Sequence, residues 1–307
     1  SAGTGRKILA RAAEHLIPVE LELGGKDPMI VFEDANLDRA AAGAAWGALT
    51  NTGQSCTSVE RVYVQESVYE AFRERLLREA GRITQKVDSD GNADIGVMTS
   101  DAQVRIVAQH VDEAVAAGAK LLTGTSWDRR DKNIPPLVME RVDHDMAVCR
   151  DETFGPVIPL IPFAKEGDAV RLANDSQYGL SASVWSADLK RCDRVARALV
   201  TGNVSVNNVM LTEGNPALPF GGVKGSGFGR YKGEFGFYTF SNIKAIIVDK
   251  NSAKIEANWY PLTAEKFQVF RSMMVSLFRG GVMGLVGFAL AGLRLEGLAA
   301  RLWKRGR

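Results

Sequence analysis

The sequence predicts an α/β protein with a mostly parallel sheet, followed by a C-terminal helical tail. Strand-like and helical patterns alternate from residue 19 to residue 206, which is typical of parallel strands joined by crossover helices. The first 25 residues are interpreted as the end of a doubly wound, Rossmann-type domain, because a helical pattern leads into an alternating strand. Beyond residue 250 the composition becomes basic and apolar. At 307 residues, the chain can hold one or two domains.

Hydrophobic periodicity places the elements in order. Helices are predicted over residues 4–15, 37–50, 68–84, 101–117, 168–173, 189–199 and 231–240. Strands are predicted over residues 19–23, 29–32, 62–65, 120–123, 157–163, 182–186, 203–206 and 241–248. A polar segment at residues 88–92 separates the third helix from the fourth. The predicted domains are residues 1–25, residues 26–230, a return segment with a terminal strand at residues 231–250, and the tail at residues 251–307.

The bulk composition is that of an ordinary soluble globular protein. A formal net charge of +2 gives no reason to expect a polyanionic partner such as nucleic acid. The three cysteines, Cys56, Cys149 and Cys192, are odd in number and widely spaced, which argues against a disulfide framework and against a metal site. This pattern suits a reducing compartment, and no signal-peptide pattern follows Ser1. We therefore expect a cytoplasmic protein.

Residues 51–61 place one cysteine in a short polar loop between a helix and a strand. Gly53 allows a tight turn, and the small side chains around Cys56 leave space beside its sulfur. A thiol is nucleophilic as the thiolate, so a reactive cysteine fits such a loop better than an apolar core. A buried structural thiol is the alternative, and composition alone favours it for most single cysteines.

A second stretch upstream, residues 20–28, ends an alternating strand in a Gly-Gly turn and carries a carboxylate at Glu22. The two stretches contain Leu-Glu-Leu-Gly-Gly-Lys and Gly-Gln-Ser-Cys. This pair resembles the aldehyde dehydrogenase superfamily, whose base and nucleophile motifs have these forms, in this order and at this separation. The resemblance implies an aldehyde dehydrogenase-like fold, with Cys56 as the nucleophile and Glu22 as the general base. Cys149 and Cys192 match no catalytic motif and are expected to be packing thiols.

The resemblance also implies an NAD or NADP cofactor. The glutamate and phenylalanine of Asp-Glu-Thr-Phe-Gly-Pro, here Glu152 and Phe154, would contact the nicotinamide ribose and lie near the ring. Ser1 would belong to a Gly/Ser turn at a helix N-terminus beside the pyrophosphate. Gly24 of the base motif is placed in the same site. Without the other two motifs, Glu152 would be interpreted as a surface acid before a Gly-Pro turn.

A glycine-dense run at residues 219–230 lacks both the G-x-G-x-x-G spacing and a Walker ending, so it is not predicted to bind phosphate. In the resembling family this run is a loop near the active site, and its aromatic, Phe220 here, walls the aldehyde pocket. Asn207 lies in the segment that lines the substrate entrance in that family. The acid that many members carry after the Gly-Arg of the run is Tyr231 here, which hints at a hydrophobic aldehyde.

These residues suggest a reaction in two stages. Cys56 attacks an aldehyde, its backbone N–H helps to hold the oxyanion, and loss of hydride to nicotinamide leaves a thioester that Glu22-activated water hydrolyses. His15, His110 and His144 are expected to be structural or solvated rather than partners of the thiol. The alternatives are a relative that hands the thioester to coenzyme A, and a catalytically silent fragment that acts as an oligomerisation or membrane-associated module.

The resemblance covers residues 1 to about 248. The family's oxyanion asparagine, its adenosine-ribose lysine and most of its cofactor sheet would precede Ser1, so the chain is interpreted as the C-terminal portion of a longer protein. In the family the last strand, residues 241–248 here, extends the sheet of a neighbouring subunit. A homo-oligomer is therefore implied.

The tail differs from the rest of the chain in charge. Against one acid, Glu296, residues 266–307 hold eight basic side chains: Lys266, Arg271, Arg279, Arg294, Arg301, Lys304, Arg305 and Arg307. Residues 280–293 are almost wholly apolar but fall short of the roughly 20 residues of a membrane span. We expect a basic, apolar terminal helix that contacts a membrane surface. Packing on the protein's own body or on a neighbouring subunit is the alternative.

Overall fold

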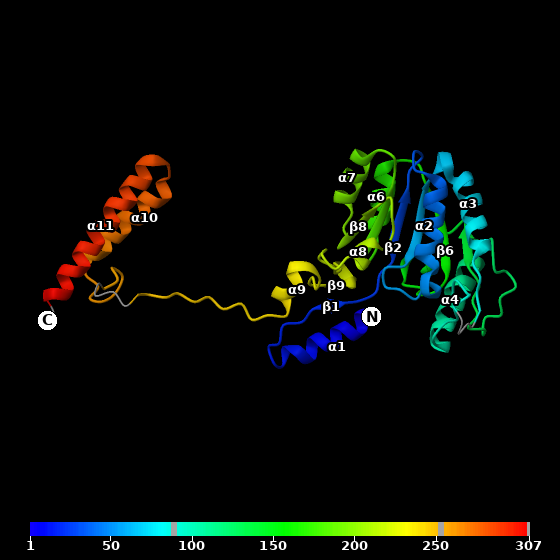
Figure 1. The fold of residues 1–307 in the computed structure, drawn as a ribbon, viewed down its shortest axis with the longest axis horizontal. Helices are drawn as coiled ribbons and strands as arrows, with labels where there is room; N and C mark the ends of the chain where they lie inside the picture. The colour runs from blue at the N-terminus through cyan, green and yellow to red at the C-terminus, as the bar shows by residue number, and fades with distance from the viewer. Residues whose placement is uncertain (87–90, 251–254, 306–307) are drawn as a thin grey trace. The chain divides into compact units, whose positions relative to one another are not determined.

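The computed structural model describes residues 1–86, 91–250 and 255–305 (Figure 1). The chain divides into two compact units, Ser1–Asn242 and Ile243–Arg307. Of the polar segment predicted at residues 88–92, residues 88–90 lie outside the described residues, as do residues 251–254 and Arg307 of the predicted tail. The first unit contains the sheets, and the second is helical.

The first unit is built on a seven-stranded sheet with the order β4-β5-β6-β3-β2-β7-β8. Neighbouring strands are parallel except for the antiparallel pair β4 and β5. The strands are β2 (Asp27–Val31), β3 (Val59–Gln65), β4 (Lys120–Leu121), β5 (Leu137–Glu140), β6 (Val157–Phe163), β7 (Ser181–Trp185) and β8 (Asn203–Val206). The interior strand β2 is buried along its whole length, as expected where helices cover both faces of a parallel sheet.

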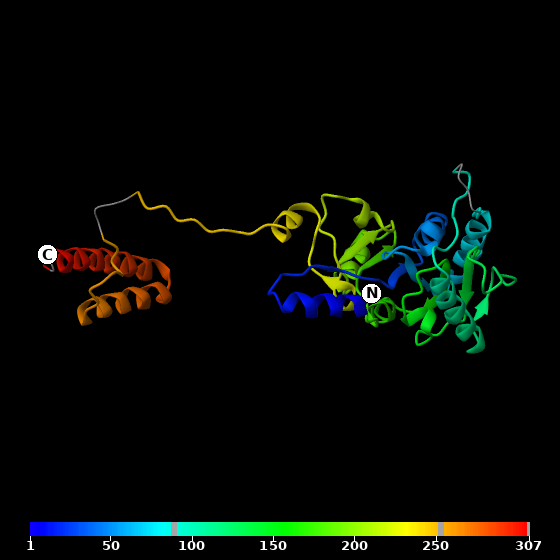
Figure 2. The ribbon, with the colours of Figure 1, turned by 90° about the horizontal axis from the view of Figure 1, so that it is seen from below.

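Helices cover both faces of this sheet (Figures 1 and 2). On one face lie α2 (Leu37–Leu49) and α3 (Tyr69–Arg82), and the many alanines of α2 allow it to approach the strands closely. On the other face lie α4 (Asp101–Ala116), α6 (Glu166–Asn174) and α7 (Leu189–Ala198). A core on each side of the sheet is the arrangement of doubly wound α/β domains.

A second, two-stranded sheet is separate from the main one. β1 (Leu21–Glu22) pairs antiparallel with β9 (Gly227–Phe228), so that Leu21 is opposite Phe228. The remaining elements are α1 (Ala2–Ala13), η1 (Thr50–Gly53), η2 (Glu66–Val68), α5 (Ala147–Arg150), α8 (Leu211–Gly214), η3 (Lys224–Ser226) and α9 (Gly233–Thr239). The small sheet joins the two ends of the first unit's sequence.

The predicted class, α/β with a mostly parallel sheet, is confirmed, and most predicted elements are present within a few residues of their predicted ends. β5 and β9 are not anticipated by the sequence patterns. The predicted strand at residues 241–248 is wrong for the chain by itself, because these residues form no strand. A strand needs a hydrogen-bonded neighbour, and no described segment of the chain pairs with this one. The predicted boundaries at residues 25 and 230 stay predictions.

The second unit contains a helical hairpin of α10 (Ala264–Arg279) and α11 (Gly281–Arg305). Gly280 and Gly281 form the turn with φ angles of 69° and 66°, which glycine adopts readily. The tail therefore contains two helices rather than the single terminal helix expected. The sequence also predicts that the apolar stretch is too short for a membrane span. This prediction is wrong, since Gly281–Lys304 is long and apolar enough to cross a membrane by length and composition.

Candidate active site

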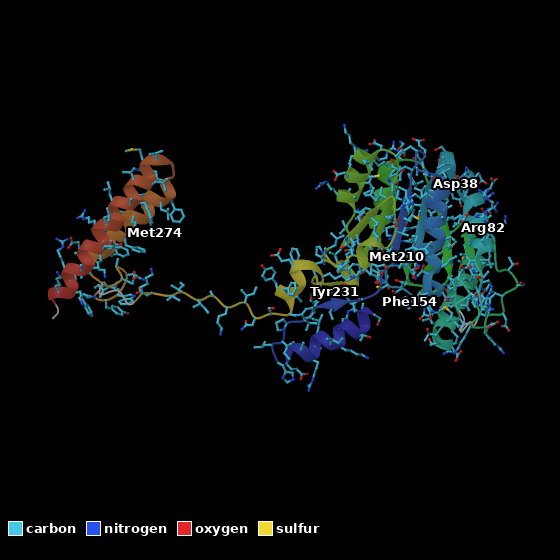
Figure 3. The ribbon with its side chains drawn as sticks, viewed as in Figure 1. Asp38, Arg82, Phe154, Met210, Tyr231 and Met274 are labelled. Carbon is cyan, nitrogen blue, oxygen red and sulfur yellow. The ribbon has the colours of Figure 1, made fainter. Side chains whose placement is uncertain are left out.

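The candidate residues gather at the amino end of the parallel strands. The turn at residues 24–26 precedes β2, Cys56 precedes β3, and Glu152 and Phe154 precede β6. Because neighbouring parallel strands begin at the same edge of a sheet, these three segments lie together. Figure 3 shows Phe154 towards this edge and Asp38, which follows β2, towards the other.

The backbone of the loop before Cys56 is tightly constrained. Thr52 and Gly53 adopt φ angles of 60° and 72°. A side chain at Gly53 would collide with the backbone of Gly155, so glycine is required for this approach. The contact fixes the cysteine loop against the loop that carries Glu152.

Cys56 is a free cysteine with a half-buried side chain. The pKa of its thiol is raised to about 12, first by burial and then by the charges of Glu213, Asp27 and Glu22. The free chain therefore holds a protonated thiol at neutral pH rather than a preformed thiolate. A base must take this proton before the sulfur can attack.

Glu22 has the properties of such a base. It lies on β1, opposite Gly227 of β9. Its pKa is raised to about 7, first by burial and then by the charge of Glu20, while Arg230 and the backbone of Gly222 partly oppose the shift. A carboxyl group with this pKa gains and loses a proton near neutral pH, which is what general-base catalysis requires.

The Gly24-Gly25 turn contacts both the cysteine loop and Glu152. The backbone N–H of Gly25 donates to Glu152 Oε1 at 3.2 Å, and a Cβ on Gly24 would overlap the Glu152 carboxylate. A Cβ on Gly25 would overlap the carbonyl oxygen of Cys56. The pKa of Glu152 is raised to about 7, first by burial and then by the charge of Glu60. The two glycines therefore let two candidate site residues approach one turn.

A buried ion pair that the sequence analysis misses supports the loop around Phe154. Lys26 Nζ and Glu60 Oε2 are 2.5 Å apart, and both side chains are nearly inaccessible to solvent. Glu60 also accepts the backbone N–H of Thr153 at 2.7 Å and that of Phe154 at 2.9 Å. These bonds hold Phe154 at a φ of 48°. The signal in the sequence is a glutamate within an apolar strand, since a buried charge must be paired.

The structure does not bring all of the predicted residues together. Ser1 caps α1 with its side-chain oxygen. Asn207 instead follows β8, at the carboxyl end of the strands, and its amide exchanges hydrogen bonds with the backbone of Ser186. Because Cys56 lies at the opposite end of the strands, the position of Asn207 does not support the expectation that it lines the substrate entrance.

Aromatic residues lie close to the thiol. Phe220 is buried and packs edge-to-face on Tyr231, with ring centroids 5.8 Å apart. Lys232 Nζ lies 5.0 Å from the Phe220 centroid and 5.6 Å from the Tyr231 centroid. The pKa of Tyr231 is raised first by burial and then by the charges of Glu22 and Cys56. Tyr231 is therefore near enough to the candidate nucleophile and base for their charges to affect it.

The other cysteines and the histidines lie apart from this group. Cys149 and Cys192 are buried in the core, as expected for packing thiols. His110 and His144 hydrogen-bond to threonine and tyrosine hydroxyls rather than to Cys56. Within the described part of the chain, no cluster of His, Cys, Asp and Glu side chains could hold a metal ion.

Comparison with known proteins identifies the family. The model of the Aldehyde dehydrogenase family matches residues 1–246. The chain belongs to the aldehyde dehydrogenase family. The aldehyde dehydrogenase-like fold expected from the two motifs is thereby confirmed.

Relatives share about half of their length with this chain. It is 45% identical over 272 residues to a 4,4'-diapolycopene aldehyde oxidase of Methylomonas sp., covering 88% of this chain and 50% of that protein. It is 35% identical over 248 residues to an NADP(+) succinate-semialdehyde dehydrogenase of Escherichia coli K12, covering 81% and 51%. The crystal structure of an NAD-dependent aldehyde dehydrogenase from Sinorhizobium meliloti matches with a TM-score of 0.78 and 38% identity, covering 83% and 51%. The chain thus spans about half the length of the curated relatives it matches.

Proposed function

We propose that the chain carries the catalytic thiol and base of an NAD(P)-dependent aldehyde dehydrogenase, which oxidises an aldehyde to a carboxylic acid. One observation carries the proposal: the Gly24-Gly25 turn contacts both the Cys56 loop and the Glu152 carboxylate. A nucleophile and an acceptor for sugar hydroxyls therefore share one site. Glu22, with a pKa of about 7, adds a base to them. Oxidation of an aldehyde through a thioester requires these parts.

The reaction begins with the thiol of Cys56. Because its pKa is about 12, only about one thiol in 10⁵ would be ionised at pH 7. Glu22 takes the proton as the sulfur adds to the aldehyde carbonyl. The new C–S bond leaves negative charge on the former carbonyl oxygen, and the backbone N–H of Cys56 donates to it. The product is a thiohemiacetal on Cys56.

The second half of the reaction releases the acid. When bound, an oxidised nicotinamide would accept the hydride whose loss converts the thiohemiacetal to a thioester. Glu22 first releases the proton of Cys56 to solvent and then takes a proton from water, whose oxygen attacks the thioester carbon. The C–S bond breaks, the sulfur of Cys56 regains a proton, and the carboxylic acid leaves. One aldehyde and one water thus give one acid, with two electrons removed.

We assign Ser1, Gly24, Glu152 and Phe154 to the cofactor. The Glu152 carboxylate offers acceptors for ribose hydroxyls, and the missing side chain of Gly24 lets it lie against the turn. The N-terminus of α1 at Ser1 favours an anion such as a pyrophosphate. Two of the relatives carry NADP(+) and NAD in their names. These observations support NAD or NADP as the cofactor.

For the substrate, we propose a hydrophobic aldehyde. Phe220 and Tyr231 place two aromatic rings near the thiol, and apolar ligands bind in pockets lined by such rings. The relative with 45% identity is named for the aldehyde of 4,4'-diapolycopene. Both observations favour an apolar substrate over a small polar one.

Partners are also part of the proposal. Residues 243–248 expose four β-branched side chains by 74–97%, namely Ile243, Ile246, Ile247 and Val248. We propose that this segment pairs with the sheet of a second copy in a homo-oligomer. The second unit exposes apolar side chains on both helices and is rich in basic residues. We propose that residues 266–307 of a cytoplasmic enzyme contact an anionic membrane surface.

The deciding experiment is hydrolysis of 4-nitrophenyl acetate by the purified chain, which needs the thiol but no cofactor. Cys56→Ala should reduce hydrolysis to the uncatalysed rate, whereas Cys192→Ala, at a buried thiol, should keep the wild-type rate. Equal rates in Cys56→Ala and wild type would overturn the nucleophile assignment. Formation of NAD(P)H with a series of aldehydes then tests the oxidation. A chain with an active thiol that neither binds nor reduces NAD(P)+ would support a silent interaction module instead.

A further inference from the structure

We infer that Glu213 makes the site select against aldehydes that carry a negative charge, so that the substrate is an uncharged aldehyde. Glu213 lies on α8 and belongs to none of the motifs used above. The inference rests on the proposed function, because it concerns the substrate of the same thiol. It identifies a specificity-determining residue contributed by a different element from those that carry Cys56 and Glu22.

A hydrogen bond fixes Glu213 at the nucleophile. The hydroxyl of Thr57 donates to Glu213 Oε2, and Thr57 directly follows Cys56. Thr57 is only 2% exposed, and its hydroxyl is also 3.3 Å from that of Ser55. If the carboxylate turned away, the buried hydroxyl of Thr57 would keep only the longer contact with Ser55, which costs free energy. The negative charge is therefore held next to the reactive residue.

The loop that carries Glu213 is also anchored to the aromatic pair through Lys232. Lys232 Nζ donates to the backbone carbonyl of Glu213 and lies 5.0 Å from the ring of Phe220. The pKa of Tyr231 is raised first by burial and then by a set of nearby charges that includes both Cys56 and Glu213. Glu213 and the aromatic pair therefore border the same space beside the thiol.

The other charged and titratable groups around the thiol are Glu20, Glu22, Asp27, Arg230, Tyr231 and Lys232. Burial raises the pKa of Asp27 well above its usual value, which favours its uncharged form. Burial first, and Glu20 second, raises the pKa of Glu22 to about 7, and Arg230 opposes this charge. Lys232 donates to the backbone of Glu213 rather than to its carboxylate. Glu213 thus adds to this group a carboxylate that is separate from the proposed base and that contacts the residue next to Cys56.

A fixed negative charge beside the nucleophile repels an anionic reactant and leaves an uncharged one unaffected. For two unit charges about 6 Å apart in water, the effect on a rate is about threefold, and it grows where burial excludes water. An aldehyde with a carboxylate near its reactive carbon is therefore disfavoured. An apolar aldehyde that packs on Tyr231, which is partly exposed, is accepted.

The test uses the thiol of the purified chain and needs neither cofactor nor aldehyde. Two methanethiosulfonates with the same reactive group, the anionic sulfonatoethyl and the cationic trimethylammonioethyl reagents, each form a disulfide with Cys56 and release methanesulfinate. Mass spectrometry gives the rate at which each reagent modifies Cys56. Each rate is divided by the rate of the same reagent with 2-mercaptoethanol, which removes the difference in intrinsic reactivity between the two reagents. We expect wild type to favour the cationic reagent. In Glu213→Gln, whose amide oxygen can still accept from Thr57, this preference should fall about threefold or more.

Glu66→Gln is the matched control, because it removes the same charge from an exposed side chain at the opposite end of β3. Its preference should equal that of wild type. Raising the ionic strength should reduce the preference of wild type, which tests the charge effect without any variant. An unchanged preference in folded Glu213→Gln, or none in wild type at low salt, overturns the inference but not the nucleophile. If Cys56 in the native chain does not react with either reagent, the proposed nucleophile is overturned as well.

Discussion

Gly24 and Glu152 occupy adjoining space, so that a Cβ on Gly24 would overlap the Glu152 carboxylate. The next N–H along the chain, that of Gly25, donates to the same carboxylate at 3.2 Å. The turn that follows β1, the strand of Glu22, thus holds Glu152, which is proposed to bind the ribose of the cofactor. The two glycines are needed for this contact as well as for the turn itself.

Gly24→Ala should therefore push the Glu152 carboxylate away and weaken cofactor binding. We expect the dissociation constant for NAD(P)+ to rise about tenfold, with little change in the rate of 4-nitrophenyl acetate hydrolysis. Gly81→Ala is the matched control, because nothing lies within 4 Å of a Cβ there. In the last turn of α3 it should leave stability unchanged or raise it slightly. Unchanged NAD(P)+ binding in Gly24→Ala would contradict the assignment of Glu152.

The buried pair of Lys26 and Glu60 should be essential to the fold. Glu60→Gln leaves the ammonium of Lys26 buried without its counter-charge, so the free energy of unfolding in urea should fall by about 3–5 kcal/mol. Adding Lys26→Met should recover part of this loss, because no buried charge then remains. Asp193→Asn is the control, since its pair with Arg197 is 62% and 78% exposed and contributes about 0–1 kcal/mol. Equal losses in the single and double variants would argue against the ion pair as the cause.

The rate of ester hydrolysis should rise with pH through about 7, because Glu22 must be ionised to accept the proton of Cys56. Glu22→Gln should lose this rise and hydrolyse the ester roughly 10²–10⁴ times more slowly. The pKa of Glu152 is also about 7, so Glu152→Gln is the control and should keep the wild-type profile. If Glu152→Gln removed the rise and Glu22→Gln did not, the base would be misassigned.

The raised pKa values also predict how stability depends on pH. The carboxyls of Glu22 and Glu152 titrate near 4.5 in the unfolded chain and near about 7 in the native one. Between these values the native state holds protons that the unfolded state has released, so the free energy of unfolding falls as pH rises. Glu22→Gln should reduce this fall by about 1–2 kcal/mol, a value discounted for its partial exposure. Urea titrations at about pH 5 and about pH 8 measure the difference, and an identical fall in both proteins would contradict it.

The tail should bring the chain to vesicles that contain anionic lipid but not to vesicles of neutral lipid alone. Val282→Glu changes a side chain that is 78% exposed on α11, and it should weaken co-sedimentation about tenfold. Leu189→Glu is the matched control, because it places the same charge at a side chain that is 66% exposed on α7, outside the hairpin. Truncation after Lys250 should abolish co-sedimentation. Equal binding by the truncated chain would favour the alternative that the tail packs against protein.

The fold of the first unit is predictable largely because periodicity is a local property. The segments at residues 157–163 and 203–206 have strand patterns, and both form the predicted strands. Residues 241–248 have a similar pattern but no partner strand in the chain, so the pattern alone does not make a strand there. β9 is only two residues long and exists because β1 pairs with it, which no local pattern reveals.

The candidate site also contains residues that the sequence identifies and residues that it does not. Cys56 and Glu22 stand in motifs that identify them by sequence alone. Glu60 and Glu213 do not, because their importance comes from contacts with the backbone of Thr153 and the hydroxyl of Thr57. The polar loop around Cys56 suggests a reactive thiol, but its raised pKa depends on burial and on carboxylates from other elements.

The pairing of β1 with β9 sets the order in which the site can assemble. Glu22 lies opposite Gly227, so the strand of the base has no partner until residues 227–228 have been made. The cysteine loop and strands β2, β3 and β7 are all made by residue 185, and domains can begin to fold during synthesis. An unfinished chain would therefore carry the thiol without a fixed base to activate it. The order of the sequence thus delays the full assembly of thiol and base until residues 227–228 have been made.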